Sequence, residues 1–260
     1  MLSADPGRKG NTVAVGKQHL RVAATADLHY TMASRGSLPR AFFEISEQAD
    51  VLLLCGDLTD HGLREEAELV ARELNTAVRI PMVGVLGNHD YQSGKQVEVR
   101  RVFQDAGIQI LDGDTCEVLD VGFAGVKGFA GGFGNRALQP WGEDMIKRFV
   151  HEAVEEALKL ESALVKLRTS QRVAVLHYSP IQGTVEGEPI EIFPFLGSSR
   201  LEEPLNRNSV AVAFHGHAHH GSLEGRTLAG IPVYNVSSQL LQRSGPNRMP
   251  FRVVDVPVKH

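Results

Sequence analysis

Short runs of aliphatic residues recur along the chain, and each of the first three stops at a group of polar residues. These runs cover residues 20–26, 51–54 and 81–86, and stretches with the apolar spacing of a helix lie between them at 39–48 and 63–77. Unbroken aliphatic runs of this length are typical of strands that are buried on both faces. Because the strands alternate with helices, the pattern predicts an α/β unit with parallel pairing and right-handed crossovers.

The rest of the chain continues this pattern with more closely spaced strands. Helices are predicted over residues 95–106 and 143–168, and short strands separated by Asp and Gly turns are typical of a meander. Strands are expected at residues 108–111, 116–119, 121–126, 173–176, 210–214, 231–236 and 251–254. We predict a flexible arm at residues 1–18, followed by a single domain over residues 19–260 that contains two groups of strands.

The predicted helix over residues 143–168 has an apolar stripe on one side and acidic residues between the stripe positions. The acidic residues are Glu152, Glu155, Glu156 and Glu161. This alternation is the normal pattern of an amphipathic helix, so we assign all four glutamates to the solvent-exposed face rather than to a metal site.

The composition is that of a folded globular protein without a strong charge. The 260 residues are 42% hydrophobic and 22% charged, and the formal net charge is -4. This balance argues against a surface that coats nucleic acid, so we expect no extended nucleic-acid partner. Cys55 lies inside an aliphatic run and Cys116 is the only other cysteine, which favours a reduced, buried thiol at Cys55 over a disulfide.

The sequence carries no membrane signal. The N-terminal residues hold no apolar stretch of the length that a signal peptide needs, and no apolar run approaches the roughly 18 residues of a membrane helix. We therefore expect a soluble cytoplasmic protein with no membrane partner.

Five apolar strands end in side chains that bind metal ions or act as acids and bases. These side chains are Asp27 and His29, Asp57 and Asp60, Asn88, His89 and Asp90, His177, and His217 and His219. A single histidine at a strand end is more often structural than metal-binding. Five strands that deliver polar groups to one edge are different, because polar groups packed together without a partner are costly, and a metal ion supplies that partner.

The number of candidate ligands indicates two metal ions. The ligands are Asp27, His29, Asp57, Asn88, His177, His217 and His219. This set is too large for a single zinc ion and natural for two ions that share a carboxylate. A mixture of carboxylate, carboxamide and imidazole without thiolate favours manganese(II), iron or zinc over copper or magnesium. The pairs at 27/29 and 217/219 would each face one cluster if the backbone stays extended, because side chains two residues apart then share a face.

These five blocks resemble the motifs of the calcineurin-like metallophosphoesterases in order and approximate spacing. They are Asp27-x-His29, Gly56-Asp57-x-x-Asp60-x-Gly62, Gly87-Asn88-His89-Asp90, His177 and Gly216-His217-x-His219, and they lie within residues 20–240. The resemblance implies an α/β fold of two mixed β-sheets packed as a sandwich and flanked by helices, in four layers (αββα). It also implies a binuclear centre of two divalent or mixed-valence metal ions at one edge.

The resemblance also implies a role for each residue. The first ion would be held by Asp27, His29, Asp57 and His219, and the second by Asp57, Asn88, His177 and His217, with Asp57 bridging. His89 would contact the phosphoryl oxygen or protonate the leaving group, Asp90 would orient His89, and Asp60 would fix the ligand geometry. The implied reaction is hydrolysis of a phosphate ester by a hydroxide that bridges the ions.

We expect the substrate to be a small-molecule phosphoester. His61 stands where the Ser/Thr protein phosphatases of the wider family carry an arginine that binds phosphate, which argues against that branch. The motifs are more similar to those of the small bacterial phosphodiesterases, so we expect a phosphodiesterase acting on a nucleotide-like molecule. A phosphomonoesterase of the same fold, a single-zinc amide hydrolase and a non-catalytic scaffold are the alternatives. The complete ligand set favours catalysis.

Three segments are candidate walls of the substrate pocket, at residues 30–39, 128–136 and 182–200. The glycine-rich stretch at 128–135 is either a lid or a plain linker. Arg136 and Arg200 are candidates to pair with a second phosphate or a base, although an exposed surface arginine is the commoner case. The sequence names neither the substrate, the native ions nor the oligomeric state.

Overall fold

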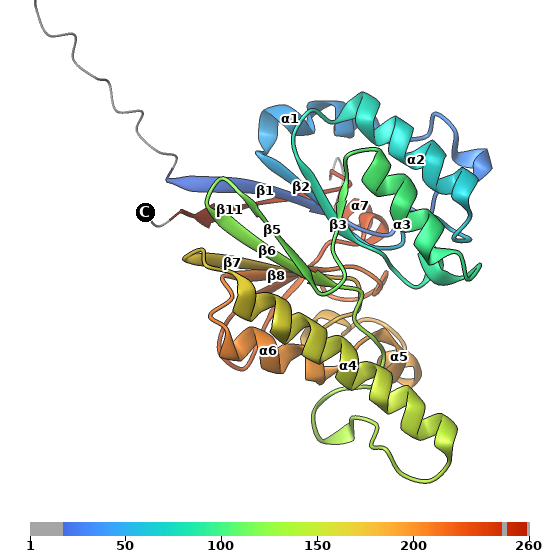
Figure 1. The fold of residues 1–260 in the computed structure, drawn as a ribbon, viewed down its shortest axis with the longest axis vertical. Coiled ribbons are helices and arrows are strands. Elements are labelled where there is room, and N and C mark those ends of the chain that lie inside the picture. Colours follow the sequence, from blue (N-terminus) through green and yellow to red (C-terminus); the bar gives the residue numbers. More distant parts are fainter. Residues whose placement is uncertain (1–17, 246–248, 259–260) are drawn as a thin grey trace, which may run out of the picture.

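Two β-sheets lie face to face, with helices on the outer side of each sheet (Figure 1). The structure is a computed structural model, and it describes residues 18–245 and 249–258. The four layers confirm the predicted fold class of two mixed sheets flanked by helices. Residues 1–17 of the predicted arm lie outside the described residues, so the arm and the domain limits at 19–260 stay predictions.

The first sheet combines four strands from the N-terminal half with one strand from near the C-terminal end. In spatial order they are β11 (Arg252–Pro257), β1 (His19–Thr25), β2 (Val51–Cys55), β3 (Met82–Val85) and β4 (Gln109–Ile110). The strands β1 to β4 pair in parallel, as predicted, and β11 runs antiparallel to β1. The outer face is covered by α1 (Ile45–Gln48), α2 (Arg64–Ala77) and α3 (Gln96–Asp105) (Figure 1).

The second sheet is built from the middle and C-terminal parts of the chain. In spatial order it holds β5 (Asp114–Val118), β6 (Val121–Val126), β7 (Gln171–Leu176), β8 (Val212–His215), β10 (Pro232–Asn235) and β9 (Glu224–Arg226). The central pairs are parallel, and β5 and β9 are antiparallel edge strands. The outer face is covered by α4 (Asp144–Lys166) and α6 (Glu202–Arg207) (Figure 1).

Side chains along β2 alternate between two apolar layers. Val51, Leu53 and Cys55 pack between the two sheets, whereas Leu52 and Leu54 pack against the outer helices. All five are fully buried, which explains why this strand is an unbroken aliphatic run. Each such side chain stabilises the fold by about 1.5–3 kcal/mol, so the end of β2, where Asp57 follows, is firmly held inside the sandwich.

Some short elements were not anticipated from the sequence. Among them are the edge strand β9, the helix α5 (Phe193–Leu196) and the helix α7 (Ser238–Arg243). Each is too short to show a periodic pattern. The helix α7 begins against the end of β1, where the Ser238 hydroxyl donates a hydrogen bond of 3.0 Å to the carbonyl of Asp27.

The predicted exposure of Glu156 is wrong. Its side chain is 1% exposed and lies on the inner face of α4, because the helical period places it between Ala153 and Leu160. The carboxylate accepts hydrogen bonds of 2.7 Å from the Gly128 amide and from Lys159 Nζ. These two partners satisfy the buried charge, and they join α4 to the end of β6.

Both cysteines are buried and free, which agrees with the predicted reduced thiol at Cys55. Among the helices of the described residues, none combines the length and the apolar character needed to span a membrane.

Candidate metal centre

The polar ends of five strands meet at one edge of the sandwich. Asp27, Asp57 and Asn88 follow strands of the first sheet, whereas His177 and His217 follow strands of the second. Three groups of side chains each offer ligand atoms that lie within 4.8 Å of one another. The groups are Asp27, His29 and His219; Asp57, His177 and His217; and His29, Asp57 and His89.

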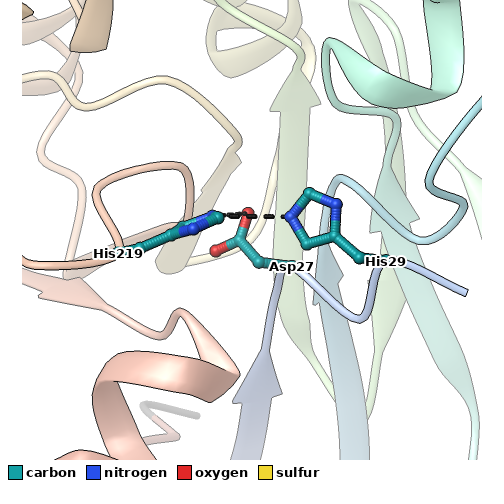
Figure 2. Close-up of side chains that lie close together, drawn as sticks. All are labelled: Asp27, His29 and His219. Atoms are coloured by element: carbon teal, nitrogen blue, oxygen red, sulfur yellow. Dashed lines mark hydrogen bonds and ion pairs between the residues drawn. The ribbon is translucent and has the colours of Figure 1, made fainter.

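The first group joins the end of β1 to the loop after β8. His219 Nε2 lies 3.5 Å from His29 Nε2 and 3.5 Å from Asp27 Oδ1. Figure 2 shows the Asp27 carboxylate near the point where the two imidazole rings approach each other from opposite sides. Two imidazole nitrogens and a carboxylate oxygen that converge on one point form a ligand set suited to a divalent transition metal.

The second group joins the ends of β2, β3, β7 and β8. His177 Nε2 lies 3.4 Å from Asp57 Oδ2 and 2.8 Å from Asn88 Oδ1. The ring of His217 packs beside that of His177, with 4.9 Å between the ring centroids. Residues from both sheets therefore contribute to this group.

Asp57 lies between the two groups. Its Oδ2 atom is 3.9 Å from His29 Nε2 and 3.4 Å from His177 Nε2. Its Oδ1 atom accepts a hydrogen bond of 2.8 Å from the backbone amide of His89. One oxygen thus faces both groups while the other is held in place, an arrangement that would suit a carboxylate ligand shared between them.

The remaining ring nitrogens of three histidines are held by fixed acceptors. His29 Nδ1 lies 3.0 Å from Asp60 Oδ1, and His177 Nδ1 lies 3.0 Å from the carbonyl of Cys55. His217 Nε2 lies 3.2 Å from the carbonyl of Phe195. Metal-binding histidines typically donate their second ring N–H to a carbonyl or carboxylate, which fixes the tautomer. The donor set and its supports therefore fit a metal centre.

The charges of the site also suit cations. Burial raises the pKa of the Asp57 carboxyl, but the charge and hydrogen bond of His177 outweigh it and hold that pKa far below the usual value. Burial likewise raises the pKa of Asp27, but the hydrogen bond from His219 and the charge of His177 bring it below its usual value. Both side chains are 1% exposed and are anionic at neutral pH. Two buried carboxylates so close together call for positive charge beside them.

The extended backbone assumed for the ligand pairs is wrong. Asp27, His29, Asp57 and His217 have positive φ angles of 58°, 46°, 51° and 70°. The left-handed region costs a non-glycine residue about 1–3 kcal/mol and is found mainly where surrounding contacts enforce it. The amides of Asp27 and His29 donate to the carbonyls of the 56–57 turn, at 3.0 Å each. The turns, rather than strand alternation, aim these side chains, and His217 and His219 reach different groups.

Two glycines of the motifs are required by close packing. A Cβ atom at Gly87 would collide with the backbone nitrogen and the carboxylate of Asp57. Gly56 has a φ of 85°, and a Cβ there would lie 2.5 Å from His177 Nδ1. Any larger residue at either position would displace a candidate ligand.

Asp60, rather than Asp90, contacts the His89 ring. His89 Nδ1 lies 2.7 Å from the Asp60 carbonyl and 3.5 Å from its Oδ1 atom. The Asp60 carboxylate therefore touches both His29 and His89, whose ring centroids are 4.5 Å apart.

The contacts of Asp90 do not fit the predicted role of orienting His89. Its buried carboxylate accepts hydrogen bonds from the amides of Leu58, Thr59 and Gly87 and from the Thr59 hydroxyl. Burial and the nearby charge of Asp57 raise its pKa to about 6. Asp90 thus ties the turn after β2 to the turn after β3, beneath the site.

Two residues beside the second group were not anticipated from the sequence. The Tyr178 ring packs on His217 with 4.4 Å between centroids, and the Phe195 carbonyl faces His217 Nε2. Tyr178 directly follows a candidate ligand, which is the only sequence signal it carries. Phe195 lies in the candidate wall 182–200, and its side chain is 57% exposed.

Neither of the two arginines proposed as phosphate contacts hydrogen-bonds to these groups in the described part of the chain. Arg200 Nη2 donates a hydrogen bond of 2.9 Å to the carbonyl of Leu138, and Arg136 is exposed on the surface. The loop from Gly131 to Leu138 packs against residues 194–199, because the Gly131 amide donates to the Pro194 carbonyl at 2.7 Å. The glycine-rich segment is therefore tied by its backbone to residues 194–199.

His215 has a structural position, as its place at a strand end suggests. It is fully buried, with Nδ1 2.7 Å from the Gly216 carbonyl and Nε2 2.8 Å from the Thr184 hydroxyl. Burial lowers its pKa to about 4, so the ring is neutral at physiological pH. His215 thereby anchors residues 182–184 against the end of β8.

Comparison with known proteins agrees with this geometry. The family model described as calcineurin-like phosphoesterase matches residues 20–221. A search of curated protein sequences finds no match. One solved structure has a TM-score of 0.55 and 16% sequence identity, over 84% of this chain and 91% of its own length.

Two further solved structures are similar in fold. TT1561 of Thermus thermophilus has a TM-score of 0.53 and 14% identity, over 93% of this chain and all (100%) of its own. A "putative 5'-nucleotidase" from Staphylococcus aureus, in complex with alpha-ketoglutarate, has a TM-score of 0.54 and 14% identity. That match covers 92% of this chain and 54% of the other, so this chain spans about half the length of that protein. At these identities the likeness shows the fold alone.

Proposed function

We propose that this chain, which belongs to the calcineurin-like phosphoesterase family, hydrolyses a small nucleotide-like phosphodiester at a binuclear metal centre. Family membership makes the chain a hydrolase of phosphoric ester bonds. The observation that supports a binuclear centre is the position of Asp57 Oδ2, which faces ligand groups on both sides.

Each ion has a candidate set of ligands. The first is Asp27, His29, Asp57 and His219, and the second is Asp57, Asn88, His177 and His217. Manganese(II), iron and zinc suit these donors. Two bound ions supply Lewis acidity, which lowers the pKa of a coordinated water to near neutral and offsets negative charge on the phosphoryl oxygens.

The chain itself supplies the acid. His89 belongs to the third group of side chains. Its backbone amide donates a hydrogen bond to Asp57 Oδ1, and its ring nitrogen Nδ1 contacts the Asp60 carbonyl. With Nδ1 held by the Asp60 carbonyl, Nε2 is the ring nitrogen left to face a substrate. Imidazole is the side chain most often used to protonate a leaving group such as an alkoxide near neutral pH. We assign His89 this role and Asp60 that of holding both His89 and His29.

Two observations support a diester substrate. A phosphodiester carries one negative charge and a monoester up to two. Arg200 donates to the Leu138 carbonyl and Arg136 is exposed on the surface, so we assign neither arginine to a second charge. The Phe195 side chain is exposed and its backbone carbonyl contacts His217, so we propose that this residue offers an apolar surface to an aromatic leaving group such as a nucleobase. The named 5'-nucleotidase among the fold neighbours favours a second candidate, a phosphomonoesterase.

The test compares two chromogenic esters on metal-stripped protein supplied with manganese(II). A phosphodiesterase turns over bis-p-nitrophenyl phosphate with a higher kcat/KM than p-nitrophenyl phosphate. The opposite preference would assign the chain to the phosphomonoesterases. If two ions bind and neither ester reacts, the non-catalytic scaffold becomes the better account.

A further inference from the structure

A buried lysine lies behind the second group of ligands. Lys127 directly follows β6 and is 8% exposed. Its ammonium lies 4.9 Å from the ring centroid of Phe129, 5.3 Å from that of Tyr178 and 5.4 Å from that of Tyr91. A cation within about 6 Å of a ring face is attracted to it, and the attraction is stronger when the cation is removed from water. Three rings therefore enclose one ammonium group.

The rings belong to different parts of the site. Tyr91 lies in the turn after β3, three residues beyond Asn88, and so comes from the first sheet. Tyr178 comes from the second sheet, directly after His177. Its ring lies 4.4 Å from that of His217 and 5.4 Å from that of His177. The lysine thus joins, through two rings, the segments that carry Asn88, His177 and His217.

The backbone of Lys127 holds the same segment. Its carbonyl accepts hydrogen bonds of 3.1 Å from the His177 amide and 3.0 Å from the Tyr178 amide. The ammonium donates to the Gly128 carbonyl at 2.8 Å, and the Gly128 amide donates to buried Glu156. Burial lowers the pKa of Lys127, and the charge of Glu156 acts in the opposite direction. The anion that offsets this cation is thus built into α4.

We infer that Lys127 is a positioning residue for the second metal ion, because its ammonium holds Tyr91 and Tyr178 together across the two sheets. This inference rests on the proposed binuclear centre. The Lys127 ammonium contacts the rings of Tyr91 and Tyr178, and the Tyr178 ring contacts His177 and His217. These contacts involve the second ligand group and not the first. Loss of the ammonium should therefore lower the affinity for the second ion and leave the affinity for the first unchanged.

The test is manganese(II) binding to the full chain with Lys127→Met, which keeps the length of the side chain and removes its charge. Calorimetric titration should show the first equivalent unchanged and the second bound about 10- to 100-fold more weakly, the usual effect of losing a residue that supports metal ligands. Electron paramagnetic resonance adds a readout that is independent of activity: the coupled signal of a manganese pair should give way to that of an isolated ion.

A matched control uses the neighbouring lysine. The Lys159 ammonium belongs to the same network but lies against the carboxylates of Glu156 and Asp112. Lys159→Met should keep both ions. Tyr91→Phe, which retains the ring, should behave like the wild type, and Tyr91→Leu should behave like Lys127→Met. If Lys127→Met does not fold, the two Tyr91 variants carry the same expectation.

Three results would overturn the inference. They are unchanged binding of both ions by Lys127→Met, equal weakening of both ions, and an equal effect of Lys159→Met. A wild-type chain that binds two ions and hydrolyses phosphoesters would leave the proposed function standing in each case. A wild-type chain that binds a single ion would remove the binuclear centre and this inference with it.

Discussion

The imidazole of His177 and the carboxamide of Asn88 come from different sheets, and Nε2 of the first lies 2.8 Å from Oδ1 of the second. The other nitrogen of His177 faces the Cys55 carbonyl at 3.0 Å. Because both nitrogens face acceptors, the position and the orientation of the ring are fixed. Burial lowers the pKa of His177, but the charges of Asp57 and Asp27 raise it to about 9. The two carboxylates thus favour positive charge at this point, and an ion that took Nε2 as a ligand would displace the proton there.

Removal of metal ions should destabilise the protein. Asp27 and Asp57 are buried carboxylates that an ion would neutralise. Ions that bind only the folded chain add about 2.7 kcal/mol at a concentration 100-fold above the dissociation constant. For a chain of this size we expect a loss of about 5–10 °C in Tm after chelation. Scanning calorimetry, with manganese(II) added back as the control, measures this; an unchanged Tm would argue against metal binding by the folded state.

His89→Ala should keep both ions and lose turnover. His89 lies beside the ligand groups, and we assign it to the acid rather than to ion binding. Removing a general acid lowers kcat by about 10²–10⁴-fold. The loss should be greater for an alkyl ester than for a nitrophenyl ester, because nitrophenolate leaves without a proton. Metal analysis of the purified variant is decisive here, since a missing ion would make His89 a ligand.

Asp60→Asn should lower the affinity of the chain for the first ion. The Asp60 carboxylate holds His29 Nδ1 at 3.0 Å, and such supports typically contribute 10- to 100-fold in metal affinity. Asp60 is partly exposed, so the variant should fold. Asp105→Asn, at an exposed ion pair on α3, is the control and should bind both ions normally. Titration with manganese(II) would contradict the assignment if the two variants behaved alike.

Asp90→Ala should unfold more readily than His89→Ala. The Asp90 carboxylate accepts four hydrogen bonds at a fully buried position, and each unpaired buried donor costs about 1–3 kcal/mol. We therefore expect a loss of at least about 3 kcal/mol in the free energy of unfolding, measured by urea denaturation. Normal stability combined with lost activity would return Asp90 to a catalytic role.

The sequence predicts the strands and the residues at their ends because burial on both faces and strand termini leave local patterns. Alternate side chains of β2 must be apolar for two different reasons. One set packs between the sheets (Val51, Leu53 and Cys55), and the other packs under the outer helices (Leu52 and Leu54). Asp57 then stands out as the first polar side chain beyond the strand. The parallel order of β1 to β4 follows from the alternation with helices.

Contacts between turns leave no such pattern. Asp60 touches both His29 and His89 only because three turns meet in space. Glu156 has the spacing of the inner face of α4, but a charged residue is normally predicted to face solvent. Its burial depends on two partners from the folded structure, the Gly128 amide and Lys159. The left-handed backbone at Asp27 and His217 is likewise imposed by tertiary contacts, so the expectation of an extended backbone failed there.

Asp57→Asn should remove the centre as a whole. Because Asp57 Oδ2 faces both ligand groups, loss of its charge should weaken both ions and abolish hydrolysis. An asparagine is nearly the same size, so folding should be retained. Retained activity would mean that the two groups do not share this carboxylate.

The most direct measurement is a titration of the metal-stripped wild-type chain with manganese(II), followed at each step by hydrolysis of bis-p-nitrophenyl phosphate. We predict little activity after the first equivalent and a rise to full activity with the second, and no rise at all in Asp57→Asn. Full activity after one equivalent would contradict the binuclear centre.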